Sequence, residues 1–478
     1  VQYNVVSTEF TGASQDVPAL PYQSVQVNGT AQALTALTFG NLTIGNFGSG
    51  AVFDPVGFPI TVTGQLQVQP GGLLQMTNAA DSVDVGGYVS FAGDNSNGHL
   101  TVGTLVLRSG FVQNGGGNDS AFYATGTHRT IFTGGSSPLL GVSYAGTRFN
   151  RLIVRDTVDL QDGSLPLVVG DSLLLQQGTI YGVGANRLTA LGPVIADAQS
   201  ALFVDTLETY GTLSVPVDTN FGVITTRFFG TNQAIPSNLS YLNVDILGTV
   251  HPVAKFEAQD TLNVLAGNFD VNGQTVIADS LFQTAGTGTL KMSDPADTVI
   301  VFGPATFAGG STTGLLTAGY FETPILRQNA TGSTASFSAS GSHLLAIVGN
   351  QTGGAEQIDF QSAGAAASHP QNLSLSGNQT VDLASNLFVA DTFFYNVGDG
   401  VVNGAAGATV TVGGPLMINS FPNLFVDTLE LRDPTPIQGS YAPGTWVPKV
   451  TRFAGINQVI RDTNSYHTVV ITGSAHIS

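Results

Sequence analysis

The amino-acid sequence predicts an all-β protein, a parallel β-solenoid built of about four repeat cassettes of roughly 110 residues each. Three observations predict this fold. Short segments alternate between apolar and polar residues, similar segments recur at long spacing, and no segment sustains the 3.6-residue periodicity of a helix. Tandem β-sandwich domains are the alternative, because one sandwich of about 100 residues has nearly the length of a cassette. The solenoid is favoured because no Pro/Ser-rich linker separates the cassettes.

Two sequence patterns mark the repeats. The heptapeptide at 202–208 recurs unchanged at 424–430, two cassette lengths further along the chain. A second marker contains Thr, Phe and Gly in that order and ends at Gly12, Gly230 and Gly455, with looser copies ending at Gly134 and Gly349. The markers divide the chain into the end of a preceding repeat at 1–12, four cassettes at 13–134, 135–230, 231–349 and 350–455, and the start of a fifth repeat, a possible assembly strand, at 456–478.

Within a cassette the predicted strands are short, and Gly, Asn or Asp follows them to supply the positive φ that turns need. Four such strands are centred on Leu42, Leu66, Val89 and Leu105, and each step between them is close to one coil of a β-helix. We therefore expect about five coils per cassette. Differences in cassette length are expected in the polar loops at 93–99, 114–120 and 328–342.

Composition limits the possible partners. Lys and Arg number 14 against 32 Asp and Glu, and the net charge of −18 disfavours binding to nucleic acid. The absence of Cys excludes disulfides and thiolate metal sites. No apolar run reaches the length of a membrane span. Because the chain begins at Val1 without a charged and then apolar leader, we expect any signal peptide to be removed or to lie outside this sequence.

The titratable residues do not form a recognisable active site. The seven histidines are not spaced as a metal-binding pair on one helix or strand would be. They lie at positions 99, 128, 251, 343, 369, 467 and 476. The densest acidic group is Asp156, Asp159 and Asp162, but residues three apart in a strand point to opposite faces. We therefore expect acids in turns, assign no catalytic, cofactor-binding or metal-binding residue, and predict that the protein is not an enzyme. A polysaccharide-degrading β-helix enzyme is the less favoured alternative.

Two further expectations concern acidic residues. Calcium is the one possible ion, because most acids are Asp and residues 115–119 form a fragment of a Gly/Asp calcium-binding repeat. Asp205 and Asp427 occupy the same place in the exact repeat, which indicates a structural turn or a ladder of side chains.

Aromatic and asparagine residues give expectations about core and surface. Phe10, Phe132, Phe228 and Phe453 recur at the marker and are predicted to stack in the core. Trp446 and exposed tyrosines are possible contacts for surface glycans. Acceptor sequences for N-glycosylation would mark surface positions at Asn28, Asn41, Asn118, Asn238, Asn329, Asn350, Asn372 and Asn378.

The chain has coils rich in Gly, Asn and Thr, such as residues 261–273, and it contains no Cys and few Lys. It resembles bacterial exported β-solenoid repeat proteins of the autotransporter-passenger and filamentous-adhesin class. The resemblance is one of composition and brings no catalytic residues with it. It implies an extended extracellular body that serves adhesion, surface coating or filament building.

Both ends of the chain fall inside a repeat, and the partial units at 1–12 and 456–478 are complementary. One explanation is a fragment of a longer array, because solenoids normally end in atypical capping units. The other is head-to-tail assembly, in which strands of one copy continue onto the next. We expect a filament or surface-layer subunit, extracellular or at the cell surface, whose main partner is itself. A surface adhesin that binds glycans or cells is the alternative.

Overall fold

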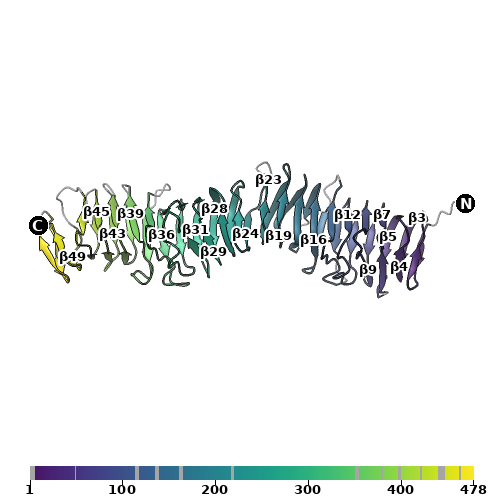
Figure 1. Ribbon diagram of the computed structural model, residues 1–478, viewed down its shortest axis with the longest axis horizontal. Coiled ribbons are helices and arrows are strands. Elements are labelled where there is room, and N and C mark those ends of the chain that lie inside the picture. The colour runs from purple at the N-terminus through teal and green to yellow at the C-terminus, as the bar shows by residue number, and fades with distance from the viewer. Residues whose placement is uncertain are drawn as a thin grey trace. The chain divides into compact units, whose positions relative to one another are not determined.

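The computed structural model describes residues 6–478 except 49, 114–117, 135–138, 161–164, 217–219, 350–354, 378–379, 397–399, 420–422, 440–446 and 462–463. The chain divides into two compact units, Val1–Arg227 and Phe228–Ser478. None of the described residues is helical, and the described part of the chain therefore contains no membrane-spanning helix. In each unit short strands stack as successive coils (Figure 1).

The strands of the first unit are short where Gly and Asn turns are frequent and longer towards residue 200. They are β1 (Thr8–Phe10), β2 (Gln15–Val17), β3 (Tyr22–Val27), β4 (Thr30–Ala33), β5 (Leu37–Ile44), β6 (Ala51–Asp54), β7 (Pro59–Val62), β8 (Leu66–Val68), β9 (Gly72–Leu74), β10 (Ser82–Val85), β11 (Val89–Phe91), β12 (Thr104–Leu107), β13 (Phe111–Gln113), β14 (Arg129–Phe132), β15 (Leu139–Val142), β16 (Arg148–Val154), β17 (Thr157–Leu160), β18 (Leu167–Leu175), β19 (Thr179–Ala190), β20 (Val194–Ala196), β21 (Ala201–Thr209), β22 (Leu213–Ser214) and β23 (Asn220–Phe221). The boundary between the units falls within β24 (Thr225–Phe228).

The second unit continues with strands of the same kind. They are β25 (Gln233–Ile235), β26 (Tyr241–Ile246), β27 (Thr249–Pro252), β28 (Phe256–Val264), β29 (Asn268–Asp270), β30 (Thr275–Ala278), β31 (Leu281–Thr284), β32 (Thr289–Lys291), β33 (Thr298–Val301), β34 (Pro304–Phe307), β35 (Tyr320–Thr323), β36 (Ile325–Gln328), β37 (Leu344–Ile347), β38 (Glu356–Phe360), β39 (Asn372–Ser376), β40 (Thr380–Leu383), β41 (Leu387–Val389), β42 (Phe393–Asn396), β43 (Val401–Gly404), β44 (Thr409–Val412), β45 (Leu416–Ile418), β46 (Leu424–Phe425), β47 (Thr428–Leu431), β48 (Ile437–Gln438), β49 (Val450–Phe453), β50 (Gln458–Ile460), β51 (Val469–Ile471) and β52 (Ala475–Ile477).

The strands pair in parallel with the equivalent strands of neighbouring coils. In the first unit β7, β10, β12, β14 and β16 follow one another in this way, and in the second unit β33, β35, β37 and β39 do so. The prediction of a parallel β-solenoid is therefore confirmed. The alternative of tandem β-sandwiches is wrong, because sandwiches are built of antiparallel sheets.

The register confirms most of the coil spacing predicted from the sequence. Leu42 pairs with Leu66, and Leu66 pairs with Val89, as the first two predicted steps require. The third step is wrong, because Val89 pairs with Phe111, while Leu105 lies on the neighbouring face opposite Val83. Two strands in one coil have the same alternating pattern, so the sequence alone does not distinguish them.

The core consists of the inward residues of each alternating strand. Most strands show the burial pattern expected of one buried face, for example in β10, β12, β33 and β40. Phenylalanine rings from successive coils stack in this core, as Phe91, Phe111 and Phe122 do with ring centroids 4.9–5.8 Å apart. Phe10, Phe132, Phe228 and Phe453 are all buried, which confirms their prediction as core residues. Each such ring contributes about 1.5–3 kcal/mol by burial.

The three clear copies of the marker share one local structure. In each copy the backbone N–H of the marker glycine donates to the side-chain Oε1 of a glutamine three residues later, and a buried marker phenylalanine packs against a tyrosine. These contacts join Gly12 to Gln15, Gly230 to Gln233 and Gly455 to Gln458, and Phe10 to Tyr22, Phe228 to Tyr241 and Phe453 to Tyr466. Successive copies begin two cassette lengths apart, and the finer division into four cassettes stays a prediction.

In each of the three clear copies, a glycine of the next coil stacks on the marker glycine. In the second unit, a Cβ atom added to Gly248 would overlap the carbonyl oxygen of Gly230 in the coil below. The same close approach holds Gly29 against Gly12 and Gly473 against Gly455. Because the overlap is with backbone, only a shift of one coil would relieve it.

We expect Gly248→Ala to lower the free energy of unfolding by about 1–3 kcal/mol, the usual cost of overpacking in a tight core. Urea unfolding followed by circular dichroism measures the change. Gly364→Ala is the matched control, because nothing lies within 4 Å of a Cβ placed there. Equal effects of the two substitutions would contradict the close contact.

Candidate functional site

The last described coil is the candidate site. It contains β51 and β52, which stack in parallel on β49 and β50 of the preceding coil. Together with β49 and β50, this coil repeats the structure of the marker segment at 8–33 and of its second copy at 226–252. In all three segments, the residue after the upper glycine of the stacked pair donates its backbone N–H to the carbonyl of the marker glycine. That bond runs from Thr30 to Gly12, from Thr249 to Gly230 and from Ser474 to Gly455.

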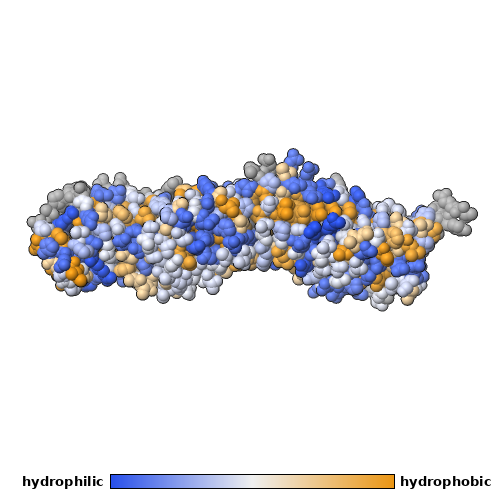
Figure 2. All heavy atoms as spheres, in the orientation of Figure 1, coloured by the Kyte–Doolittle hydropathy of each residue, from blue (hydrophilic) through white to orange (hydrophobic). Residues whose placement is uncertain are grey.

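The inward side chains of β51 and β52 are exposed, whereas their counterparts are buried. Val469, Ile471 and Ile477 are 41%, 51% and 74% exposed. The corresponding Val25, Val27 and Ala33 of the first copy are 0–1% exposed, because the coil that contains β5 and β6 covers them. In the second copy Val244 and Ile246 are completely buried. Figure 2 shows hydrophobic residues at this end of the second unit.

The backbone edge of the same coil is open. Among the described residues β51 pairs only with β49, and β52 only with β50, whereas β3 pairs on both sides, with β1 and β5. The sequence after Asp462 contains no Asp, Glu, Lys or Arg. Natural proteins usually protect open strand edges with charges or proline, and residues 464–478 contain no Asp, Glu, Lys, Arg or Pro.

The strands of the first coil, β1 and β2, also have described partners on one side only, the side opposite to that of β51 and β52. Within the described part of the chain, β1 pairs only with β3, and β2 only with β4. A strand arriving in parallel would meet the same hydrogen-bonding pattern that joins the coils inside each unit.

The two described members of the acidic group predicted from the sequence, Asp156 and Asp159, lie in a turn and in a strand. Asp156 uses its Oδ1 to accept a hydrogen bond from the Thr157 N–H at 2.8 Å, as a turn residue does. Asp159 lies within β17 with a half-buried side chain, and Asp162 lies outside the described residues. No cluster of three His, Cys, Asp or Glu suited to a metal ion occurs in the described ranges. Most of the calcium candidate at 115–119 lies outside those ranges, and calcium binding stays a prediction.

The acids of the exact heptapeptide repeat tie neighbouring coils together. Asp205 accepts a hydrogen bond from the Asn186 N–H at 3.2 Å, and Asp427 accepts one from the Gly407 N–H. Lys449 also binds Asp427, and its hydrogen bond holds the pKa of this carboxyl below the usual value. Both aspartates thus have a structural role between coils, although Asp205 lies in β21 and not in a turn.

The glutamates of the repeat have a similar role. Glu208 binds Arg187 and Arg227. Burial works against ionisation of Glu430, but the hydrogen bonds and charges of Arg432 and Arg452 outweigh burial and hold its pKa below the usual value.

Sequence reasoning missed two pairs of buried polar residues. Asp81 and Asp297, two cassette lengths apart, are almost completely buried and accept hydrogen bonds from backbone N–H groups. His128 and His343, separated by nearly the same length of chain, are 0% exposed, and their ring nitrogens have no hydrogen-bond partner among the described residues. The nearly equal spacing was a signal for both pairs, because it matches the distance between the markers.

The other residues singled out in the sequence are dispersed. His99 contacts Gln75, His369 approaches two backbone carbonyls of its own loop, and His467 and His476 are exposed on the last coil. Trp446, Asn350 and Asn378 lie outside the described residues. The remaining glycosylation acceptors are exposed or half-buried at Asn28, Asn41, Asn118, Asn238, Asn329 and Asn372.

Comparison of the chain with family models, with curated proteins and with solved structures found no match.

Proposed function

We propose that this protein is a structural repeat protein that assembles head to tail, with the open C-terminal coil of one copy stacking on the first coil of the next. The observation that carries the proposal is the exposure of Val469, Ile471 and Ile477 at positions whose counterparts are buried in the first copy of the coil. Covering these side chains would remove apolar surface from water, which is favourable by about 25 cal/mol per Å².

The direction of the strands favours a linear assembly over a closed dimer. The described strands of neighbouring coils pair in parallel. A further coil on β51 and β52 would therefore also pair in parallel, and β1 and β2 of another copy can supply its strands. Joining the last coil of one copy to the first coil of the next is a heterologous contact, which can repeat without closing. A two-fold dimer of C-terminal coils would have to pair its strands antiparallel, unlike the coils described above.

We place this assembly outside the cell, as a filament or surface layer. The lack of Cys, the scarcity of Lys and the resemblance to exported bacterial solenoids support this location. We propose no enzymatic activity, because the acids described above serve turns and contacts between coils.

The double substitution Val469→Lys/Ile471→Lys tests the proposal. We expect the unsubstituted chain to form linear assemblies that grow with concentration, and the variant to stay monomeric, because two buried charges in the contact cost several kcal/mol. Mass photometry gives the size distribution, and negative-stain electron microscopy gives the shape. Because the variant keeps β1 and β2, adding it to the unsubstituted protein should shorten the assemblies.

Val253→Lys is the matched control, since Val253 is 54% exposed beside β27 in the second copy of the coil. This variant should assemble normally. A monodisperse monomer at all concentrations, a dimer that grows no further, or full assembly by the doubly substituted chain would each refute the proposal.

A further inference from the structure

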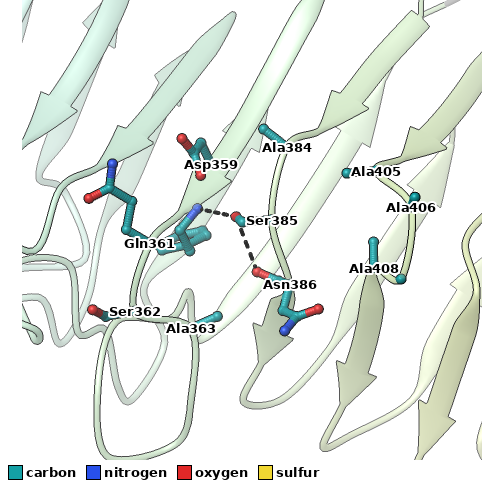
Figure 3. A pocket seen from close by; sticks show the side chains of 12 residues that line it. Asp359, Gln361, Ser362, Ala363, Ala384, Ser385, Asn386, Ala405, Ala406 and Ala408 are labelled. Atoms are coloured by element: carbon teal, nitrogen blue, oxygen red, sulfur yellow. Dashed lines mark hydrogen bonds between the residues drawn. The ribbon is translucent and has the colours of Figure 1, made fainter.

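A groove crosses successive coils of the second unit. It follows the ends of β38, β40 and β43 and encloses about 560 Å³ (Figure 3). The loop after β38 forms one wall, and the turns after β40 and β43 form the floor. Those turns contain three exposed alanines, Ala384, Ala405 and Ala406. Because alanine side chains are small, the surface is recessed there.

The polar side chains of the groove are held in place by backbone contacts. The Oδ1 of Asn386 accepts a hydrogen bond from the Thr409 N–H at 2.9 Å, and the Oε1 of Gln361 accepts one from the Ala330 N–H at 3.4 Å. With its oxygen occupied, each amide has its NH₂ group as the available donor. Ser385 completes the floor, since its Oγ accepts from the Phe360 N–H at 2.6 Å.

Asp359 supplies the acceptor. In the pairing of β36 with β38 it lies opposite Arg327, but the Arg327 Nε donates to Gln357 at 3.0 Å instead. Within the described part of the chain, the Asp359 carboxylate has no hydrogen-bond or ion-pair partner. The residues that line the groove therefore include one carboxylate acceptor, two side-chain amides and several alanine methyl groups.

The groove extends over the next coil. A second hollow of about 180 Å³ shares Ala405 and Ala406 with the first and is bordered by Phe425 and Lys449. The Phe425 ring is 46% exposed, and the charge of Lys449 is balanced by Asp427. The extended site thus combines one aromatic face with the Asp359 carboxylate, which makes no ion pair among the described residues.

From this geometry we infer that the groove binds a neutral oligosaccharide chain. A sugar hydroxyl both donates and accepts, so adjacent hydroxyls can donate to the Asp359 carboxylate and accept from the amides of Gln361 and Asn386. The C–H faces of the sugar rings would lie on the alanine methyls and on Phe425. Asp359 and the net charge of −18 disfavour an anionic polysaccharide. This inference is independent of the assembly proposed above.

The test measures the binding of short linear oligosaccharides of hexose and of N-acetylhexosamine. Saturation-transfer NMR detects the binding, and calorimetry gives the affinity. An oligouronate and an uncharged peptide serve as comparison ligands. We expect the neutral sugars to bind and Asp359→Asn to weaken binding about tenfold, the usual loss for a hydrogen bond to a charged group. Ala405→Leu should abolish binding by filling the floor, and it should fold because Ala405 is exposed.

Asp159→Asn is the matched control, a half-buried strand aspartate in the first unit, and it should bind like the unsubstituted chain. The inference fails if none of the neutral sugars binds, or if Asp359→Asn and Ala405→Leu bind normally. Preference for the oligouronate or the peptide would also overturn it. Assembly through β51 and β52 is measured without sugar, so the two proposals can fail separately.

Discussion

Lowering the pH from 7.5 to 5 is expected to destabilise the protein by about 2 kcal/mol for each of His128 and His343. Burial lowers the pKa of His128 to about 4 and that of His343 to about 3, so both rings are neutral in the folded chain at pH 5. In the unfolded chain they have the ordinary pKa of about 6.5 and become protonated. Their contribution to stability is complete above pH 6.5 and is lost as the pH falls towards 4 and 3.

The measurement is the urea dependence of unfolding at several pH values for the unsubstituted chain and for His128→Phe, His343→Phe and the double variant. Phenylalanine suits both sites, because each imidazole packs against a phenylalanine ring, Phe122 or Phe337. Each substitution should flatten the pH dependence by about 2 kcal/mol between pH 7.5 and 5, a window above the titration of ordinary carboxylates. The same slope in all four proteins would show that the histidines do not cause the acid sensitivity.

Asp297→Ala is expected to lower the free energy of unfolding by about 4 kcal/mol. The Asp297 carboxylate is 0% exposed and accepts hydrogen bonds from three backbone N–H groups, those of Gly273 at 2.5 Å, Ser293 at 2.7 Å and Asp294 at 2.9 Å. The first of these donors belongs to the preceding coil, so the side chain joins two coils. Alanine would leave the three donors without an acceptor, at about 1–3 kcal/mol each before relaxation.

Asp294→Ala is the matched control for this prediction. Asp294 lies in the same turn, but its side chain is exposed and accepts a hydrogen bond from the Ala296 N–H at 2.8 Å. We expect a loss below about 1 kcal/mol for Asp294→Ala, because water can replace an exposed acceptor. The interpretation of Asp297 as an anchor between coils would be wrong if the two substitutions had equal effects in chemical denaturation.

The fold could be predicted from the sequence because the structure of a solenoid depends on local patterns. Each strand alternates with period two, each coil ends in Gly, Asn or Asp, and the next coil repeats the pattern after about 24 residues, as from Leu42 to Leu66. The error at Leu105 shows the limit of this reasoning. A coil contains more than one alternating strand, and which strand continues a given face depends on how the chain turns between them.

The candidate sites were harder to predict, since they depend on what covers a residue. Val469 and Ile471 have the same alternating pattern as Val25 and Val27, and only the structure shows that the first pair is exposed and the second buried. His128 and Asp297 are polar residues in a polar sequence context, so burial could not be assigned to them from composition. The groove arises where two turns and one loop come together, although Asp359, Asn386 and Ala405 are distant in sequence.

The sequence by itself determined that the protein is a parallel β-solenoid, that the four marker phenylalanines lie in its core, and that its marker pattern occurs again near residue 455. These properties depend on residues close together in the chain or on exact repetition, and both can be read from one sequence. Only the tertiary structure decided that the inward side chains of β51 and β52 are exposed, that two histidines and two aspartates are buried at equivalent places, and that a polar groove crosses the segments after β38, β40 and β43. Exposure and proximity depend on the stacking of coils, which brings residues far apart in the chain into contact.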